Sequence, residues 1–231
     1  MILKNWDELP DQFKNQEVLY YYNILKNKKI NLIIKRLFDI FCSGISIIVF
    51  LPVFFVIYLI IKLDSPKEKV IFKQERITQY KKTFKILKFR TMKTNSEKIQ
   101  ITCYNDPRIT KIGKFLRKYK LDEIPQIFNI FSGNMTFVGT RPEVEKYINY
   151  YTNEMLATLL LPAGATSEAS LEFQHEEKNL KKTENINLEN LYLNDILPEK
   201  MKINLKYIKK MNFFYDVKII LKSFIVFKYG K

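Results

Sequence analysis

Two adjacent carboxylates and four cations are the residues of this sequence whose types and spacing could do chemistry. They are Asp122 and Glu123, with Lys88, Arg90, Arg117 and Arg141 in short segments before and after them. Carboxylate oxygens suit Mg²⁺, especially where phosphates also bind. Phosphoryl transfer asks a protein mainly to position the reactants and to neutralise charge on the phosphoryl oxygens. The set predicts a phosphate-handling site centred on Asp122 and Glu123, although any one of these cations taken alone is better interpreted as a solvated surface charge.

The sequence after the two carboxylates predicts a helix over residues 122–131. Pro125 falls in its first turn, where a missing N–H costs little, and SGN at residues 132–134 ends it. A helix that starts there places both carboxylates beside its positive end, which favours their ionised form. Its free backbone amides would face an incoming phosphate. Taken alone, an acidic residue in a first turn is more often a plain helix cap.

The spacing of apolar residues predicts the helices and strands that position these side chains. Residues 109–120 place their apolar side chains on one helical face and their cations on the rest, which predicts a basic amphipathic helix that carries Arg117. Such a helix suits an anionic membrane surface, and the alternative is a helix packed on a soluble core. Two short strands, the second over residues 83–89, predict a hairpin that carries Lys88. Residues 161–175 predict a loop, and residues 201–227 predict one long basic helix.

Composition narrows the class of partner. The chain has 231 residues, of which 47% are hydrophobic and 14% aromatic, too many core-forming residues for a disordered protein. Lys and Arg number 39 against 24 Asp and Glu, so the formal net charge is +15. This charge favours nucleic acid, an anionic membrane surface or a phosphorylated substrate. P-loop, dinucleotide-binding and nucleophile-elbow motifs are absent from the sequence.

The cysteines and the histidine exclude other chemistry. Cys42 lies in an apolar run and Cys103 in a polar stretch, and no CxxC motif suggests a zinc site or a disulfide framework. A reducing, cytosolic face is the simplest assumption. The single His175 argues against a mechanism that needs two imidazoles, and we expect it at the surface.

An uncharged apolar run over residues 40–61 predicts a membrane helix, because about 20 such residues can cross a bilayer. Pro52 lies near its centre and leaves the carbonyl of Ile48 without its usual N–H partner. Both flanks are rich in lysine and arginine, so the positive-inside rule prefers neither orientation. The residues alone leave two topologies open: a kinked spanning helix, or a re-entrant helix that bends at Pro52 and leaves by the face it entered.

Taken together, these segments resemble the bacterial sugar transferase family, the monotopic phosphoglycosyl transferases of glycan assembly. The resemblance covers about residues 32–225 in one order. It rests on KRLFD at 35–39, FKQER at 72–76, KFRTM at 88–92, NDPRIT at 105–110, GKFLR at 113–117, LDEIPQ at 121–126, GNMTFVG at 133–139, RP at 141–142, ILPEK at 196–200 and FYDVK at 214–218. Each piece is weak alone, but the ordered set is specific.

The resemblance implies a ping-pong transfer of sugar 1-phosphate from a UDP-sugar to a polyprenyl phosphate such as undecaprenyl phosphate. Asp122 would attack the β-phosphate and hold the phosphosugar while UMP leaves. Glu123 would bind the Mg²⁺ cofactor, and Lys88, Arg90, Arg117 and Arg141 would bind phosphates. The protein would lie at the cytosolic face of the inner membrane, on anionic lipid, and would start the assembly of a capsule, exopolysaccharide, O-antigen or glycoprotein glycan. A homodimer remains open.

The implied fold is α+β, with a re-entrant helix bent at Pro52, a small cytosolic helical domain, a short β-hairpin and interfacial amphipathic helices. We expect an N-terminal extension at 1–31, the membrane helix at 32–63, the catalytic domain at 64–200 and a C-terminal amphipathic helix at 201–231. The chain looks like the minimal form of the family, without the multi-helix membrane domain of larger relatives.

Departures from the family pattern fall outside the carboxylate pair. SPKE stands at residues 65–68, Thr78 replaces a common glycine, and PAGATS stands at 162–167 where the family has a Pro-Gly-Ile-Thr-Gly segment. These differences bear on the choice of sugar more than on phosphoryl transfer. Two alternatives stay open: a non-catalytic membrane scaffold on the same fold, and a membrane-tethered basic nucleic-acid-binding protein, which accounts for the charge but not for the Asp-Glu pair. We expect no nucleic acid as partner.

Overall fold

The computed structural model describes residues 3–93, 108–173 and 188–229, and the fold is α+β. The predicted polar turn at 96–107, Cys103 and His175 lie outside these residues. The helices are α1 (Gln16–Lys26), α2 (Lys29–Asp64), α3 (Lys111–Lys118), α4 (Gln126–Phe131), α5 (Glu145–Ile148), α6 (Asn153–Leu156), α7 (Glu168–Glu172), α9 (Leu188–Leu191), α10 (Leu197–Lys210) and α11 (Phe213–Tyr229). The strands are β1 (Ile71–Ile77), β2 (Thr83–Phe89), β3 (Met135–Val138) and β4 (Ala163–Thr166).

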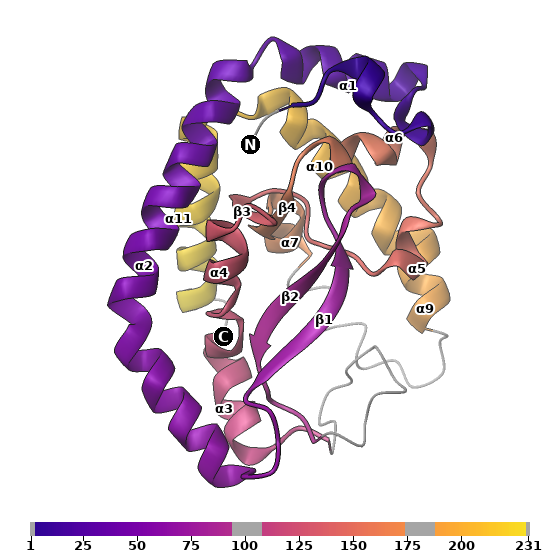
Figure 1. Cartoon of the computed structure of the whole chain (residues 1–231). Helices are drawn as coiled ribbons and strands as arrows, with labels where there is room; N and C mark the ends of the chain where they lie inside the picture. The colour runs from indigo at the N-terminus through magenta and orange to yellow at the C-terminus, as the bar shows by residue number, and fades with distance from the viewer. Residues whose placement is uncertain (1–2, 94–107, 174–187, 230–231) are drawn as a thin grey trace.

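The long helix α2 follows a bowed path along the outside of the molecule (Figure 1). Pro52 lies inside it, and the helix continues without interruption to Asp64. Only 11% of its most apolar stretch is buried, so α2 is not the core helix of a soluble protein. By length and composition it is a candidate membrane segment, which agrees with the sequence-based expectation.

The predicted hairpin is confirmed. Strands β1 and β2 pair antiparallel, with Ile71 opposite Phe89 and Ile77 opposite Thr83. Helix α4 packs between the hairpin and α2 (Figure 1). Its Asn129 side chain accepts from the backbone N–H of Leu87 at 3.0 Å and donates to the carbonyl of Lys85 at 2.9 Å. This side chain satisfies backbone groups of β2 that its partner strand leaves unpaired.

The second sheet joins segments that are distant in sequence. Strands β3 and β4 pair parallel, and Met135 lies opposite Ala163. The prediction of a loop over 161–175 is wrong for its described part, which contains β4 and α7. A strand of Ala, Gly, Ala and Thr has little β-propensity of its own and forms because β3 offers it a partner.

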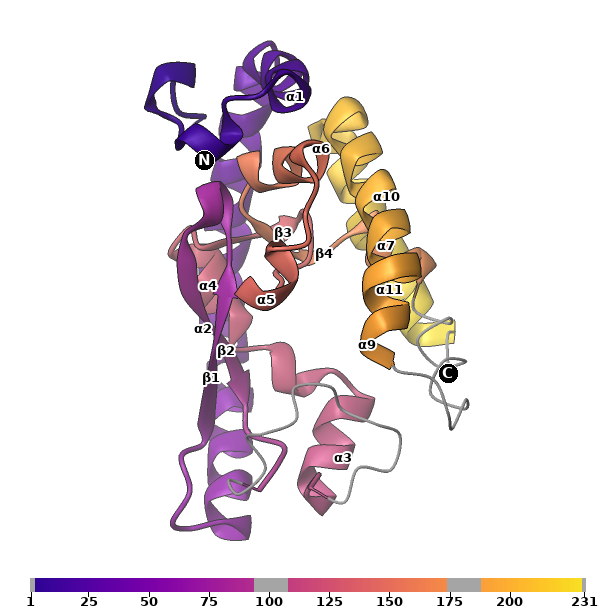
Figure 2. The same cartoon turned by 90° about the vertical axis from the view of Figure 1, so that its right-hand side faces the viewer.

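The predicted single helix over 201–227 is also wrong. Met211 adopts extended backbone angles (φ −51°, ψ 123°) and separates α10 from α11. The Asn212 side chain then accepts from the N–H of Tyr215 at 2.9 Å, as a helix N-cap does. Helices α10 and α11 both lie on the side away from the hairpin (Figure 2), and α11 runs beside α2 (Figure 1).

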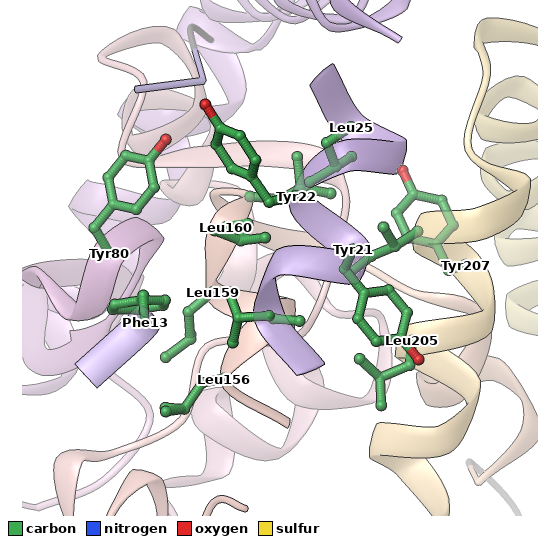
Figure 3. Packing of buried hydrophobic residues seen from close by; sticks show 14 of the residues in the cluster. Phe13, Tyr21, Tyr22, Leu25, Tyr80, Leu156, Leu159, Leu160, Leu205 and Tyr207 are labelled. Carbon is green, nitrogen blue, oxygen red and sulfur yellow. The ribbon is translucent and has the colours of Figure 1, made fainter. Parts of the chain in front are cut away.

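The largest hydrophobic cluster joins the N-terminal segment to the C-terminal half of the chain (Figure 3). Phe13, Tyr22 and Leu25 pack with Leu160 and Tyr207. The Lys28 ammonium donates to the carbonyls of residues 208, 209 and 211 and caps the end of α10. The residues before α2 are therefore part of the core that supports the C-terminal helices.

Candidate active site

Asp122 and Glu123 lie in a 3₁₀ turn, Leu121–Glu123, between α3 and α4. Lys120 precedes this turn with left-handed backbone angles (φ 52°, ψ 23°), which end α3 and redirect the chain. Asp122 is 9% exposed, and the Glu123 side chain is 26% exposed. The pair is thus largely shielded from solvent, and Glu123 remains partly accessible.

The predicted helix start at residue 122 is wrong, because α4 begins at Gln126. Pro125 is its N-cap rather than a residue of its first turn. Helix α4 has six residues, too short to supply the positive end that the sequence argument used. Any stabilisation of ionised carboxylates must come from nearby side chains.

Two of the predicted cations bind Glu123 directly. Lys88 Nζ, from the end of β2, lies 2.8 Å from Glu123 Oε1, and Arg141 Nη2, from the loop after β3, lies 3.4 Å from the same oxygen. Three elements far apart in sequence therefore meet at one carboxylate. Both contacts use Oε1, so the two cations share one edge of the Glu123 carboxylate.

Arg117 is positioned by a different set of contacts. Its Nε donates to the Thr91 hydroxyl at 2.9 Å, and the Thr91 carbonyl accepts from the N–H of Thr110 at 3.0 Å. A side chain at Gly113 would collide with that carbonyl, so glycine lets α3 approach the segment after β2 closely. Arg117 is close enough to stabilise the Asp122 carboxylate electrostatically.

The two carboxylates differ in their pKa values. Burial, and then the neighbouring charge of Glu123, raise the pKa of Asp122, while Lys88 and Arg117 oppose the rise. Burial would also raise the pKa of Glu123, but Arg141, Lys88 and Lys120 outweigh it and bring it to about 2. Glu123 is therefore a fixed anion, whereas Asp122 has the more basic, more nucleophilic carboxylate.

Arg90 is held away from this pair by other partners. Its Nη1 lies 2.6 Å from Glu68 Oε2, and its Nε donates to the Lys69 carbonyl at 2.6 Å. Strand β2 ends at Phe89, so the alternation that would align Arg90 with Lys88 stops there. Arg90 braces the connection between α2 and β1, and its predicted phosphate contact stays a prediction.

Residues without a role in the sequence analysis hold the backbone that follows Arg141. Arg76 Nη1 donates to the Pro142 carbonyl at 3.4 Å, and the Ile77 N–H donates to the Glu143 carbonyl at 2.9 Å. The Tyr192 hydroxyl donates to Glu143 Oε1 at 2.6 Å. Burial raises the pKa of Glu143. These contacts hold the backbone that presents Arg141, and no local sequence signal pairs residues so far apart.

The donor set fits a loosely held Mg²⁺. Within the described residues no group of three His, Cys, Asp or Glu side chains converges, so an all-protein metal cage is not present there. Mg²⁺ is commonly held by one or two carboxylates together with substrate phosphates and water. Asp122 and Glu123 offer that pair, and Glu123 remains ionised at any ordinary pH.

Comparison with known proteins identifies the family. The sequence model described as bacterial sugar transferase matches residues 30–229. The chain belongs to this family. The residues before position 30 lie outside the match, although they contribute Phe13 and Leu25 to the main core.

Three relatives show the range of similarity. The UDP-glucose:undecaprenyl-phosphate glucose-1-phosphate transferase of Escherichia coli (strain K12) is 34% identical over 206 residues, which cover 86% of this chain and 40% of that protein. The putative undecaprenyl-phosphate N-acetylgalactosaminyl 1-phosphate transferase of Bacillus subtilis (strain 168) is 38% identical over 126 residues, 54% of this chain and 70% of its own. The exopolysaccharide production protein PSS of Rhizobium leguminosarum bv. phaseoli is 44% identical over 114 residues, 48% of this chain and 56% of its own.

Proposed function

We propose that this chain transfers a sugar 1-phosphate from a UDP-sugar to a polyprenyl phosphate and releases UMP. The observation that carries the proposal is the meeting of Asp122 and Glu123 with Lys88, Arg117 and Arg141 beside a long apolar helix. The names of the relatives give the substrate class: the Escherichia coli protein is named for UDP-glucose and undecaprenyl phosphate. The reaction would be the first membrane step in the assembly of a glycan.

In the first half-reaction an Asp122 oxygen attacks the β-phosphorus of the UDP-sugar. A bond forms between that oxygen and phosphorus, and the bond from phosphorus to the oxygen that bridges the two phosphates breaks. UMP leaves with the bonding electrons. The raised pKa of Asp122 supports this role, because a more basic carboxylate is a better nucleophile once it is ionised.

In the second half-reaction a phosphate oxygen of the polyprenyl phosphate attacks the same phosphorus. The bond from phosphorus to Asp122 breaks, and the carboxylate returns to its starting state. The product is a polyprenyl diphosphate-sugar. Atoms and charge balance over the two steps, and no oxidant or reductant is needed.

The cations have separate tasks in this scheme. Lys88 and Arg141 both bind Glu123 Oε1 and present positive charge to the donor phosphates, while Arg117 stabilises the ionised form of Asp122. Mg²⁺, when bound to Glu123, would neutralise charge on the diphosphate and improve UMP as a leaving group. Full activity in excess EDTA would remove Glu123 as a metal ligand.

We propose that α2 is re-entrant and lies at the cytosolic face of the inner membrane. Near its start, Arg36 donates to the carbonyls of Ile130 and Phe131 at 2.8 Å. After Pro52, Phe54 packs on Phe89 with ring centres 5.3 Å apart. Both halves of the helix thus contact one polar domain, which a straight crossing of the bilayer would not allow.

Labelling in sealed vesicles tests this topology. Single cysteines placed at Lys28 and Ser65, on the two sides of α2, should react with a membrane-impermeant reagent from the same face. Reaction from opposite faces would refute the re-entrant arrangement, and a cysteine introduced at exposed Lys202 serves as a marker for the domain side.

The activity is tested by measuring UMP release from a panel of UDP-sugars, with and without polyprenyl phosphate. We expect one limited burst of UMP without acceptor and sustained release with it. A non-catalytic scaffold predicts no release with any donor. A nucleic-acid-binding protein predicts instead salt-sensitive binding to DNA, with no dependence on Asp122.

A further inference from the structure

A polar cavity lies between the N-terminal segment, the end of α1 and the start of α2. Its volume is about 340 Å³, at the lower end of the roughly 300–1,000 Å³ that small-molecule sites occupy. Leu3 and residues 5–8 line one side, and Tyr22, Lys26 and Lys29 line the other. Figure 1 shows this region at the end of the molecule where α2 begins, and α3 lies at the opposite end. All the lining residues precede position 30, so the cavity belongs to the part of the chain outside the family match.

The charged side chains that line this cavity carry both signs. Asp7 and Glu8 lie in a 3₁₀ turn, Trp6–Glu8, whereas Lys26 ends α1 and Lys29 begins α2. None of the four forms an ion pair within the described parts of the chain. Two anions and two cations therefore line one cavity without neutralising each other. A ligand that carries both charges would match each set.

An aromatic pair gives the cavity a surface for an organic cation. The ring centres of Trp6 and Tyr22 lie 5.1 Å apart in an edge-to-face arrangement. The Tyr22 hydroxyl donates to the Lys4 carbonyl at 3.0 Å, which fixes the N-terminal segment on α1. Trp attracts an ammonium group more strongly than the other aromatic rings do, and it is enriched at the depth of lipid headgroups. The side formed by Trp6 and the two carboxylates therefore suits an ammonium group.

The lysine side of the cavity leads onto the apolar surface of α2. Ile33 lies one turn after Lys29 on the same helical face, and Leu37 lies one turn further. These two side chains are 53% and 62% exposed, and Ile30 is 74% exposed. Lysine ammonium groups bind phosphates as point charges. A phosphate held by Lys29 would thus lie where the candidate membrane segment begins.

We propose that this cavity binds the headgroup of an aminophospholipid such as phosphatidylethanolamine. The ammonium group of the lipid lies against Trp6 beside the two carboxylates, and its phosphate binds Lys26 and Lys29. The acyl chains run from there along the exposed apolar face of α2 into the bilayer. The inference rests on the placement of α2 in a membrane, which is part of the proposed function, and it holds for a re-entrant or a spanning helix.

Other ligands match only part of this surface. An anionic lipid without an ammonium group leaves Asp7 and Glu8 without a counter-charge and places its phosphate near them. A soluble zwitterion matches the charges but makes no use of the apolar face of α2. The aminophospholipid is the ligand that satisfies both features.

The test uses the fluorescence of Trp6, which is the only tryptophan of the chain and therefore reports on this cavity alone. The purified protein is placed in nanodiscs of phosphatidylglycerol that contain a small fraction of a brominated lipid, either phosphatidylethanolamine or phosphatidylglycerol. The bromine atoms sit near the headgroup end of the acyl chains. We expect the ethanolamine lipid to quench Trp6 at least about threefold more than the glycerol lipid at the same fraction. Equal quenching by the two lipids would overturn the proposal.

Three variants assign the preference to particular side chains. Asp7→Asn combined with Glu8→Gln should abolish the preference for the ethanolamine lipid, because the ammonium group loses its counter-charges. Lys29→Gln should reduce the preference, because the phosphate loses a cation. Lys14→Gln is the matched control, since Lys14 pairs with Asp11 and does not line the cavity, and it should leave the preference unchanged. A preference that persists in the double variant would refute the assignment.

Soluble phosphoethanolamine distinguishes a lipid from a free zwitterion with the same charges. In detergent micelles that contain the brominated ethanolamine lipid, unlabelled phosphatidylethanolamine should restore the fluorescence of Trp6. Phosphoethanolamine at the same concentration should not, because it lacks the acyl chains that contact α2. Equal competition by the two would make this a site for a soluble ligand and would refute the lipid assignment.

The lipid site and the transfer reaction fail separately. The variant with Asp7→Asn and Glu8→Gln should release UMP at the rate of the unmodified protein, because neither side chain belongs to the active site. If the unmodified protein releases no UMP with any donor but Trp6 prefers the ethanolamine lipid, the lipid site stands and the transferase activity is lost. If UMP is released while the two lipids quench equally, the activity stands and the lipid site is wrong. A thermal melt of each variant verifies that it is folded.

Discussion

Two lysine–carboxylate pairs in this molecule differ in how completely their partners are enclosed. Lys35 and Asp216 meet at 2.6 Å, with side chains 4% and 7% exposed, whereas Lys88 and Glu123 meet at 2.8 Å, with side chains 23% and 26% exposed. The first pair joins α2 to α11 in the interior. The second joins β2 to the turn before α4, where both side chains remain partly exposed.

The enclosed pair is satisfied on both oxygens. Lys35 binds Asp216 Oδ2, and the Tyr207 hydroxyl donates to Oδ1 at 2.6 Å. At the open pair, Lys88 and Arg141 share one oxygen of Glu123, and no ion pair reaches Asp122 within the described residues. The fold itself therefore matches the charges of the enclosed cluster, whereas the open site keeps the Asp122 carboxylate available for a ligand.

The enclosed cluster also supports the open one. Asp39, one turn after Lys35, accepts from the N–H of Phe137 at 3.1 Å, so α2 holds strand β3. Strand β3 leads directly to the loop that carries Arg141. Lys35 itself forms its ion pair with Asp216 on α11. Damage to the buried cluster should therefore destabilise the fold, and damage at the open site should remove activity alone.

We expect the largest loss of activity, without a loss of stability, for Asp122→Asn. The amide has no nucleophilic oxygen, so turnover should fall by at least about a thousandfold and no phosphosugar adduct should form. UMP release and intact-protein mass spectrometry provide the two measurements. Normal turnover in this variant would remove Asp122 as the nucleophile, and the melting temperature should match that of the unmodified protein.

A large effect on stability, rather than on chemistry, is expected for Asp216→Asn. The change leaves Lys35 buried without its counter-charge, and the free energy of unfolding should fall by about 3–5 kcal/mol. Thermal unfolding in detergent measures the loss. Glu199→Gln breaks the exposed pair with Lys202 and should change stability by less than about 1 kcal/mol.

The double variant Lys35→Met with Asp216→Leu gives the complementary result. It removes both buried charges, and most of the stability should return. If the double variant is as unstable as Asp216→Asn, the cluster contributes more than an ion pair. The difference between the enclosed cluster and the open site would then lie in how their side chains pack and hydrogen-bond, and not in whether their charges are paired.

The parts of the fold that sequence could predict are those set by local pattern. The run over residues 40–61, the amphipathic helix that carries Arg117 and the limits of β2 at 83 and 89 all follow from side-chain period or composition. Lys88, Arg117 and Arg141 were grouped with the carboxylates from their types, and the structure brings these cations to the carboxylate pair.

The parts that sequence could not predict depend on distant contacts or on a single turn. Strand β4 forms only against β3, and the Glu143–Tyr192 bond joins segments separated by a long stretch of chain. The turn that holds Asp122 differs from the start of an α-helix by a few backbone angles around Lys120, which apolar periodicity does not report. The N-cap at Asn212, in contrast, was readable from its residue type.

A smaller effect is expected for Glu123→Gln. The amide keeps its size but loses the charge that Lys88 and Arg141 share, so activity should fall by roughly tenfold to a hundredfold with a higher Mg²⁺ requirement. Titration of activity with Mg²⁺ measures both changes. An unchanged Mg²⁺ requirement would assign Glu123 to holding the two cations instead of the metal.

The smallest effect is a shift in the pH profile of Arg117→Gln. Burial, and then Glu123, raise the pKa of Asp122, and Arg117 lowers it, so removal of this cation raises the pKa further. The nucleophile must be ionised, and activity is lost as pH falls through the pKa of Asp122. The acid limb of the profile should therefore move to higher pH, while Lys114→Gln on the exposed side of α3 leaves it in place. If the limb does not move while the maximal rate falls, Arg117 binds phosphate without setting the charge of Asp122, and the open site depends on its cations for substrate binding alone.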